Sequence, residues 1–198
     1  MLDFILLLVF SYLLGSIPFG YLITKLKKGT DIRKVGSGSI GGTNVARALG
    51  FKWGLLVGIL DLLKGVIPVS LAIYSFHFNE WQIIGVALVA VLGHIFPVWL
   101  KFKGGKGVAT VFGALAAIFG WKIFLIWILG WVVVLAIFQI MSFTNLLLVT
   151  FLPLIFLTVF FSIPYFVFGL LIVGLVWWSH RENVKRIIEE REPKFKIK

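Results

Sequence analysis

Two glycine-rich segments that also carry lysine and arginine offer the clearest chemistry in this sequence. The first glycine loop (residues 36–47) reads GSGSIGGTNVAR, and the second glycine loop (residues 101–107) reads KFKGGKG. Glycine allows successive backbone N–H groups to point into one concavity, and cations beside such amides attract phosphate. In the first loop, Thr43 or Asn44 can also cap a short helix that carries Arg47. We therefore expect both loops to bind anions, above all phosphate groups.

Two nucleotide-binding motifs come close to these loops but do not fit them. The spacing GxGxxG begins at Gly36, yet a dinucleotide site needs a preceding β-strand, and here an apolar helix precedes it. The second loop has Leu100 and Gly107 where a Walker A loop needs its first glycine and its final serine or threonine. An alternative to anion binding is that the glycines only form turns at span ends and that the charges only set the topology.

The segments that must position these loops are typical of an integral membrane protein. Of the 198 residues, 60% are hydrophobic and 16% are aromatic, and the mean hydropathy is +1.06. A bilayer core about 30 Å thick is crossed by about 20 apolar residues in a helix. We predict one all-α, polytopic membrane domain over residues 1–198. Its seven transmembrane helices lie at residues 2–24, 53–78, 81–100, 108–120, 121–141, 143–161 and 164–178. The fourth is short, and a re-entrant half-helix is the alternative for it.

The distribution of lysine and arginine predicts the orientation, because these residues concentrate in short cytoplasmic loops. Of the 19 Lys and Arg residues, 17 lie in residues 25–52, 101–106 and 181–198, which seven crossings place on one side of the membrane. Lys122 lies on the other side, and Lys64 lies inside a span. We therefore expect the N-terminus outside, and both glycine loops and the C-terminus in the cytoplasm.

Several other classes of chemistry are excluded or not expected. The chain has no cysteine, which rules out thiol catalysis, disulfides and thiolate metal sites. His77, His94 and His180 are too dispersed in sequence for a metal cluster, so we expect no metal and no other cofactor. The net charge of +11 lies in loops beside membrane spans, so we do not expect nucleic acid as a partner. Nothing in the sequence sets the oligomeric state, and a monomer suffices for these predictions.

Five motifs follow one another along nearly the whole chain. They are SIPFG (residues 16–20), the first glycine loop, GHIFPV (residues 93–98), FKGGKGVAT (residues 102–110) and HRENV (residues 180–184). In this order they resemble the bacterial membrane glycerol-3-phosphate acyltransferases that use acyl-phosphate. The chain departs from the common family pattern at three places, where it has Ser39, Gly42 and the residues Gln139-Ile-Met141.

The resemblance implies a seven-helix protein of the bacterial cytoplasmic (inner) membrane with an active site that faces the cytoplasm. It implies transfer of an acyl chain from acyl-phosphate to the 1-hydroxyl of glycerol 3-phosphate, which gives lysophosphatidic acid and phosphate in phospholipid biosynthesis. The partners would then be these two substrates and the lipid bilayer, and neither acyl-CoA nor acyl carrier protein would be the donor. By position, the implied catalytic residues are Lys106 and His180, and the implied substrate-binding residues are Ser37, Thr43, Asn44, Arg47, Gly104, Gly105, Lys106, Ser142, His180 and Asn183.

Such a reaction needs positioning, charge neutralisation and removal of one alcohol proton, because phosphate is a good leaving group. The His-x-x-x-x-Asp motif of other acyltransferases is absent, since no aspartate stands five positions after any of the three histidines. The proton acceptor is therefore either His180 or a phosphate oxygen of the donor, and we favour the second. The alternative from another functional class is a small membrane transporter of a phosphorylated or anionic solute, because basic loops and intramembrane charges also mark such proteins.

Three titratable residues lie inside predicted spans. Asp61 and Lys64 stand three apart on one helix face, and we expect them to pair, because an unpaired charge in lipid is costly. His94 precedes Pro97, and we expect it to satisfy a carbonyl group that the proline kink frees, with a direct role in the chemistry as the alternative. The tail that begins at His180 has an apolar stripe that suits a helix at the membrane interface.

Overall fold

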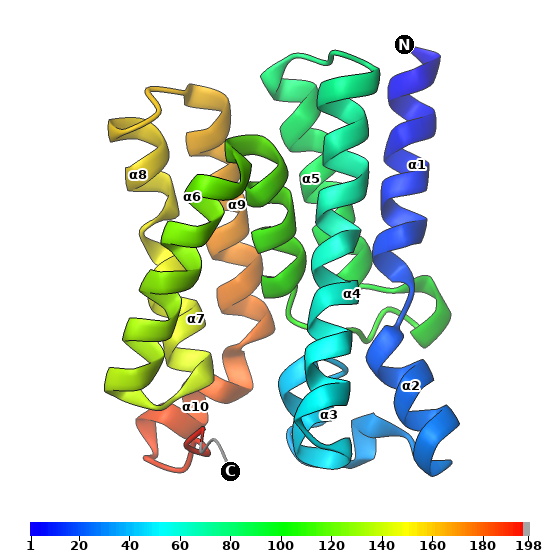
Figure 1. Ribbon diagram of the computed structural model, residues 1–198, viewed down its shortest axis with the longest axis vertical. Coiled ribbons are helices and arrows are strands. Elements are labelled where there is room, and N and C mark those ends of the chain that lie inside the picture. The colour runs from blue at the N-terminus through cyan, green and yellow to red at the C-terminus, as the bar shows by residue number, and fades with distance from the viewer. Residues whose placement is uncertain (196–198) are drawn as a thin grey trace. The chain divides into compact units, whose positions relative to one another are not determined.

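The computed structural model describes residues 1–195, which contain helices and no strand (Figure 1). The chain divides into two compact units, residues 1–118 and the residues from 119 onward, and we describe each by itself. Two basic residues of the predicted cytoplasmic tail, Lys196 and Lys198, lie outside the described residues. A single domain over residues 1–198 therefore stays a prediction.

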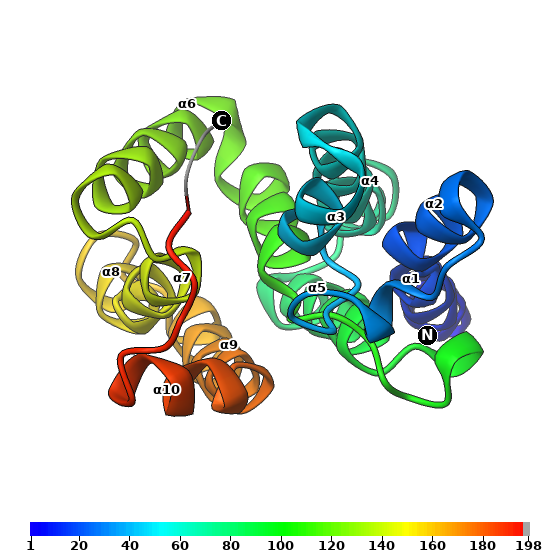
Figure 2. The same ribbon diagram turned by 90° about the horizontal axis from the view of Figure 1, so that it is seen from below.

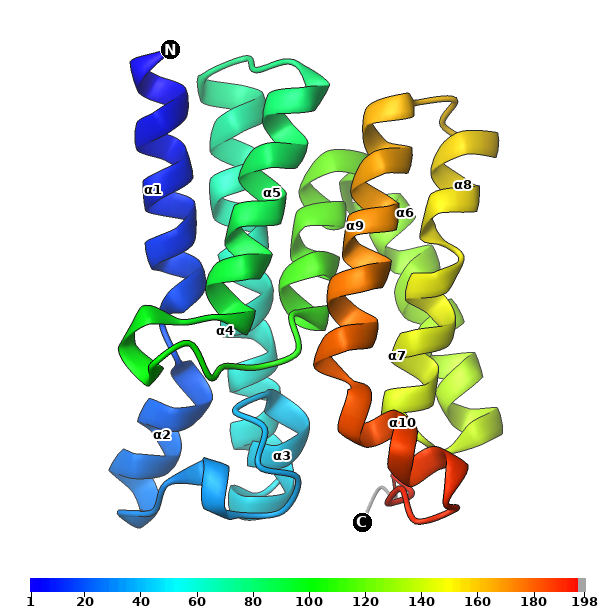
Figure 3. The same ribbon diagram turned by 180° about the vertical axis from the view of Figure 1, so that it is seen from behind.

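The first unit is built around three long helices that lie side by side, as Figures 1 and 3 show for α1, α4 and α5. Short helices and turns at their ends carry the glycine loops. In chain order the elements are α1 (Leu2–Ser16), α2 (Phe19–Lys28), the 3₁₀ turn η1 (Ile32–Lys34), α3 (Gly42–Leu49), α4 (Phe51–Ser70), the π-helical turn η2 (Leu71–Ser75), α5 (Glu80–Ile95), the 3₁₀ turn η3 (Val98–Leu100) and the first part of α6 (Val108–Phe138).

Glycines allow α1 and α5 to approach each other at backbone distance. A Cβ added to Gly15 of α1 would overlap the backbone of Ala90, and one added to Gly93 of α5 would overlap the backbone of Tyr12. The Ser11 hydroxyl also donates a hydrogen bond to a carbonyl oxygen of α5 over 2.9 Å. Small residues stabilise helix pairs in membranes because the hydrophobic effect does not drive association there and close van der Waals contact must do so.

The same device joins α3 and α6 to α4. Gly42 at the start of α3 lies against the backbone of Gly54, and Gly65 of α4 lies against the backbone of Thr110 in α6. A buried apolar cluster packs the first glycine loop against its neighbours, and its members are Ile32, Ile40, Val45, Val57 and Leu100. The loop is thus anchored on a packed core.

The second unit contains the rest of α6 and α7 (Met141–Thr150), α8 (Leu152–Thr158), α9 (Ile163–Ser179) and α10 (Arg181–Ile188). Aromatic rings form much of its packing, because Phe119 contacts Phe156, Phe160 and Tyr165 with ring centroids 4.1 to 5.4 Å apart. Figure 2 shows α10 beside the ends of α7 and α9, which it contacts. A bend of 65° separates α10 from α9.

Within residues 1–195, five helical stretches are long and apolar enough to cross a membrane, and there are six if the bent pair α9 and α10 is counted as one span. The label α6 covers the residues predicted as the fourth span and most of the fifth, and non-helical backbone at Gly120, with φ 81° and ψ 168°, divides it into two helices. The other stretches are Leu2–Lys28, Phe51–Ser75, Glu80–Leu100 and Met141–Thr158. The fold is therefore that of a polytopic helical membrane protein with five or six candidate spans, whereas seven spans and their orientation stay predictions.

Candidate active site

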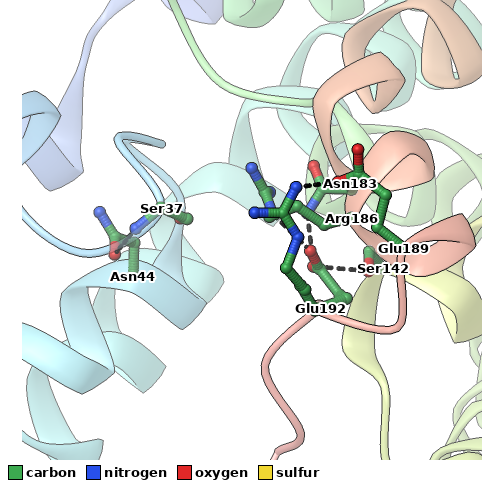
Figure 4. A network of polar contacts seen from close by, with 8 residues as sticks. Ser37, Asn44, Ser142, Asn183, Arg186, Glu189 and Glu192 are labelled. Atoms are coloured by element: carbon green, nitrogen blue, oxygen red, sulfur yellow. Dashed lines mark hydrogen bonds and ion pairs between the residues drawn. The ribbon is translucent and has the colours of Figure 1, made fainter.

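Asn44 holds the first glycine loop in shape. Its side chain is 1% exposed, and its Oδ1 accepts a hydrogen bond from the backbone N–H of Ser37 over 3.0 Å. Its Nδ2 donates to the carbonyl oxygens of Val35 and Ser39 over 2.9 and 2.8 Å. Figure 4 shows the Asn44 side chain turned toward Ser37. Both ends of the amide thus bond to the loop's own backbone, and a direct contact between Asn44 and substrate stays a prediction.

The expected cap of the short helix is wrong. Helix α3 begins at Gly42 with Gly41 as its N-cap and no side-chain capping bond, so Thr43 and Asn44 lie inside the helix. The physical reason is that Gly41 adopts the extended conformation of an N-cap, with φ −75° and ψ 163°. The Asn44 side chain turns back to the preceding loop, so it satisfies loop carbonyls instead of helix amides.

The amide concavity expected in the first loop is also wrong for three of its N–H groups. Gly38 donates to the carbonyl oxygen of Val35, Gly41 donates to the hydroxyl of Ser39, and Ser37 donates to Asn44. Gly38 is needed for its φ of +71°, in the left-handed region that other residues rarely adopt. These three amides bond within the loop, so they are not directed at a phosphate.

Three of the predicted site residues in this loop and helix differ in how far they are exposed to solvent. Ser37 is exposed, Thr43 is partly buried, and Arg47 is exposed in the last turn of α3. An arginine offers several N–H donors in a planar fork that matches phosphate oxygens. Arg47 is thus exposed to solvent in the structure, and its contact with phosphate stays a prediction.

The second glycine loop caps the end of α5 with its own amides. The N–H of Gly104 donates to the carbonyl oxygen of Ile95, and the N–H of Gly105 donates to that of His94, both over 3.0 Å. The expectation that these successive amides point into an anion-binding concavity is therefore wrong. They satisfy carbonyl groups that Pro97 leaves without helical partners. Lys106 follows directly and is partly buried.

The buried charges inside the first unit pair as expected, but His94 does not do what we predicted. Lys64 Nζ lies 2.7 Å from Asp61 Oδ1. His94 Nδ1 lies 3.4 Å from Lys64 Nζ and 3.6 Å from Asp61 Oδ1. The prediction that the His94 ring satisfies a freed carbonyl is wrong, because glycine amides of the second loop satisfy those carbonyls.

In the second unit, His180 lies at the junction of α9 and α10 and is fully buried. Its Nδ1 is 2.8 Å from the carbonyl oxygen of Val176. A carbonyl oxygen only accepts hydrogen bonds, so Nδ1 carries the proton and the neutral ring has its lone pair on Nε2. A helix carbonyl therefore helps to orient this histidine.

Glu192 joins two predicted site residues that lie far apart in the sequence. Its Oε1 accepts hydrogen bonds from Ser142 Oγ over 2.8 Å and from Asn183 Nδ2 over 2.6 Å, and its Oε2 accepts one from Arg186 Nε over 2.7 Å. Figure 4 shows these side chains converging on the carboxylate. Burial raises the pKa of the Glu192 carboxyl, but the three hydrogen bonds, that from Arg186 first, outweigh burial and hold the pKa below its usual value.

Sequence reasoning missed Glu192 and Arg186. Glu192 follows two other glutamates, Glu189 and Glu190, in a charged tail, and no local pattern distinguishes the three. Glu192 reaches the site because the chain turns back after α10, where the N–H groups of Arg191 and Glu192 both donate to the carbonyl oxygen of Arg186. Such a turn cannot be seen in residue spacing.

Apolar helices, intramembrane charges and basic loops define this chain as an integral membrane protein with polar sites at the ends of its helices. Residues 5–190 match the family described as "Glycerol-3-phosphate acyltransferase". Glycerol-3-phosphate acyltransferases of Prochlorococcus marinus (strain NATL1A) and Aquifex aeolicus (strain VF5) are 40% and 43% identical to this chain, and each alignment covers 96% of this chain and 97% of the relative.

The fold agrees with this relationship. The crystal structure of PlsY (YgiH), an integral membrane glycerol 3-phosphate acyltransferase, in its glycerol 3-phosphate form aligns with a TM-score of 0.92 and 40% identity. The alignment covers 98% of this chain and 96% of that one. The lysophosphatidic acid form aligns with a TM-score of 0.88 and 37% identity, over the same shares. This chain belongs to the glycerol-3-phosphate acyltransferase family and is an acyltransferase, which decides against the transporter alternative.

Proposed function

We propose that this protein transfers an acyl chain from acyl-phosphate to the 1-hydroxyl of glycerol 3-phosphate and releases lysophosphatidic acid and phosphate. Acylation of glycerol 3-phosphate is the activity of the family to which the chain belongs. The observation that carries the choice of donor is that two separately built glycine loops each bear a cation, Arg47 in one and Lys106 in the other. Two phosphate-bearing substrates need two such sites, whereas a thioester donor needs no second phosphate site at the reacting end.

The reaction balances without a cofactor. The 1-hydroxyl oxygen attacks the carbonyl carbon of the acyl-phosphate, the bond from that carbon to the phosphate oxygen breaks, and the hydroxyl proton passes to the departing phosphate. Lys106 and Arg47 neutralise phosphate charge, which lowers the barrier because the leaving group gains negative charge as the bond breaks. The alternative proton acceptor is Nε2 of His180, which carries the lone pair of the ring.

The remaining predicted residues receive roles from their contacts. Ser37 and Thr43 would donate hydroxyl hydrogen bonds to phosphate oxygens. Asn183 and Ser142 would bind substrate through the geometry that Glu192 gives them, because both side chains are held by that carboxylate. Gly104 and Gly105 would shape the path of the second loop.

We further propose that the protein crosses the bacterial inner membrane seven times, with its active site toward the cytoplasm. The break at Gly120 divides α6 into two parts, which supports two crossings. A single continuous helix of 31 residues would be longer than one crossing needs. With that division, nearly all loop lysines and arginines fall on the cytoplasmic side.

The donor is tested with purified protein, glycerol 3-phosphate and palmitoyl-phosphate, palmitoyl-CoA or palmitoyl-acyl carrier protein in parallel. The expected result is one lysophosphatidic acid and one inorganic phosphate per turnover with palmitoyl-phosphate, and no product with the other two donors. Product formed from the CoA or carrier-protein donor at a comparable rate would show that the donor is wrong.

The topology is tested with single cysteines, because the chain has none of its own. A cysteine in place of Lys122 should react with a membrane-impermeant maleimide added outside the cell, whereas one in place of Lys28 should react only after the membrane is opened. Equal protection of both positions would contradict seven crossings.

A further inference from the structure

A cluster of three titratable side chains is buried inside the first unit. Asp61 and Lys64 of α4 and His94 of α5 are each at most 3% exposed. Lys64 Nζ lies 2.7 Å from Asp61 and 3.4 Å from His94. Such charges are expensive to bury, and replacing a buried ion pair by apolar residues often costs no stability. Stability alone is therefore a weak explanation for this cluster.

The cluster lies where the elements around the second glycine loop meet. The Lys64 ammonium lies 5.0 Å from the centre of the Phe19 ring at the start of α2. The hydroxyl of Thr110, in the first turn of α6, donates to the Asp61 carbonyl oxygen over 3.0 Å. Helix α6 begins two residues after Lys106, at Val108. The cluster thus connects the helix before the second loop with the helix after it.

The second glycine loop rests directly on His94. A Cβ added to Gly105 would overlap the imidazole atoms Nε2, Cδ2 and Cε1, so the loop backbone lies against the edge of the ring. The Gly105 N–H also donates to the His94 carbonyl oxygen over 3.0 Å. The position of the His94 ring therefore limits where the backbone of Gly105 can lie. Lys106 is the next residue, so its backbone position depends on the same contact.

We propose that Asp61, Lys64 and His94 form a positioning device for Lys106. The ion pair holds the His94 ring in one orientation, the ring supports Gly105, and the supported backbone aims Lys106 at its phosphate. The role of Lys106 rests on the proposed function, whereas the support of the loop does not. Charged side chains suit this task because an ion pair in low dielectric tolerates little change in geometry.

The first test measures the loop itself. In the otherwise cysteine-free chain, Lys106→Cys carries a nitroxide spin label, and its mobility is recorded alone and with Asp61→Asn or His94→Ala. The expected result is a clear increase in label mobility with either change. The matched control is Ser11→Ala, which also removes a buried hydrogen bond to α5 but lies on α1, and it should leave the spectrum unchanged. An unchanged spectrum in both cluster variants would overturn the proposal.

The second test asks whether the cluster acts through Lys106. Asp61→Asn is expected to lower kcat/KM by about tenfold, and the same change in a Lys106→Ala background should have almost no further effect, since groups that act as one unit are not additive. Ser11→Ala should add its small effect equally in both backgrounds. Full additivity of Asp61→Asn and Lys106→Ala would overturn the proposal, even where the variants fold normally.

The two tests separate this inference from the proposed function. If the label becomes mobile but Lys106→Ala retains normal kinetics, the cluster supports the loop, the proposed role of Lys106 is wrong, and the part of the inference that concerns phosphate is overturned. If Lys106→Ala loses activity but the label stays immobile in the cluster variants, the proposed function survives and the positioning device is overturned.

Discussion

The Asn44 side chain accepts a hydrogen bond from the backbone N–H of Ser37 over 3.0 Å and thereby connects the start of α3 to the loop that precedes it. The two residues are seven positions apart, and both belong to the predicted substrate site. The bond uses the backbone of Ser37 and the side chain of Asn44. The loop's shape therefore depends on one of these side chains and not on the other.

Asn44→Ala should destabilise the protein by roughly 1–3 kcal/mol, because it leaves buried backbone groups of the loop without partners. The change in free energy of unfolding can be measured by titration of mixed micelles with sodium dodecyl sulfate. Ser37→Ala is the matched control, since it keeps the N–H that Asn44 binds, and it should lower activity with unchanged stability. Equal stability of the two variants would contradict the shaping role of Asn44.

Gly93→Ala should destabilise the first unit, because the added Cβ would overlap the backbone of α1 and force α1 and α5 apart. Overpacking of this kind costs typically about 1–3 kcal/mol. The same substitution at Gly174 of α9 has no atom within 4 Å of the new Cβ and should be neutral or slightly stabilising. Thermal unfolding in detergent, followed by circular dichroism, measures both, and a loss at Gly174 as large as that at Gly93 would refute the packing argument.

Glu192 makes the stability of the second unit depend on pH. The pKa of its carboxyl is lowered in the folded protein, although burial acts in the other direction, because hydrogen bonds from Arg186, Asn183 and Ser142 stabilise the charged form. A lowered folded pKa contributes stability that is present above the unfolded pKa and is lost as the pH falls through the folded pKa.

Glu192→Gln should therefore lower stability near neutral pH and weaken the loss of stability on acidification. The measurement is the free energy of unfolding at several pH values between neutral and acid. Glu182→Gln provides the control, because that side chain is 60% exposed, and its variant should follow the wild-type pH profile. A Glu192→Gln variant with the wild-type profile would show that Glu192 does not carry this dependence.

Lys106→Ala and Arg47→Ala should each lower kcat/KM by about 10- to 100-fold, because each removes a charge-assisted contact with phosphate. Steady-state kinetics with either substrate varied would show which phosphate each cation holds. Lys34→Ala, an exposed basic residue near the first glycine loop, tests whether general positive charge suffices and should change little. Unchanged KM and kcat in both site variants would contradict phosphate binding by these loops.

His180→Ala should lower turnover by less than about 100-fold if the donor phosphate accepts the proton, because a general base contributes roughly 10²–10⁴-fold. The measurement is kcat with both substrates saturating, together with their KM values. Abolished turnover with intact substrate affinities would instead assign the base to Nε2 of His180.

Much of the fold could be predicted from the sequence, because its causes are local. Hydropathy identified the apolar helices, and the spacing of Asp61 and Lys64 identified their pair, since residues three apart share a helix face. The predicted boundary between the fourth and fifth spans falls at Gly120, where the structure has non-helical backbone, whereas the number of spans stays a prediction.

The glycine loops show where local reasoning fails. Their composition correctly indicated tight turns, but the predicted concavity of amides was wrong, because those amides bond to partners that composition does not identify. For Gly104 and Gly105 the partners are carbonyl groups of α5.

By itself, then, the sequence determined a helical membrane protein with cationic glycine loops and, through its motifs, an acyltransferase of the glycerol-3-phosphate family. Only the tertiary structure decided that Asn44 shapes its loop, that His94 joins the ion pair and that Glu192 gathers Ser142 and Asn183. Hydropathy, charge and motifs can be read along the chain. Each of these contacts depends on how the chain turns back on itself, because a hydrogen bond is set by positions in space and not by residue types in order.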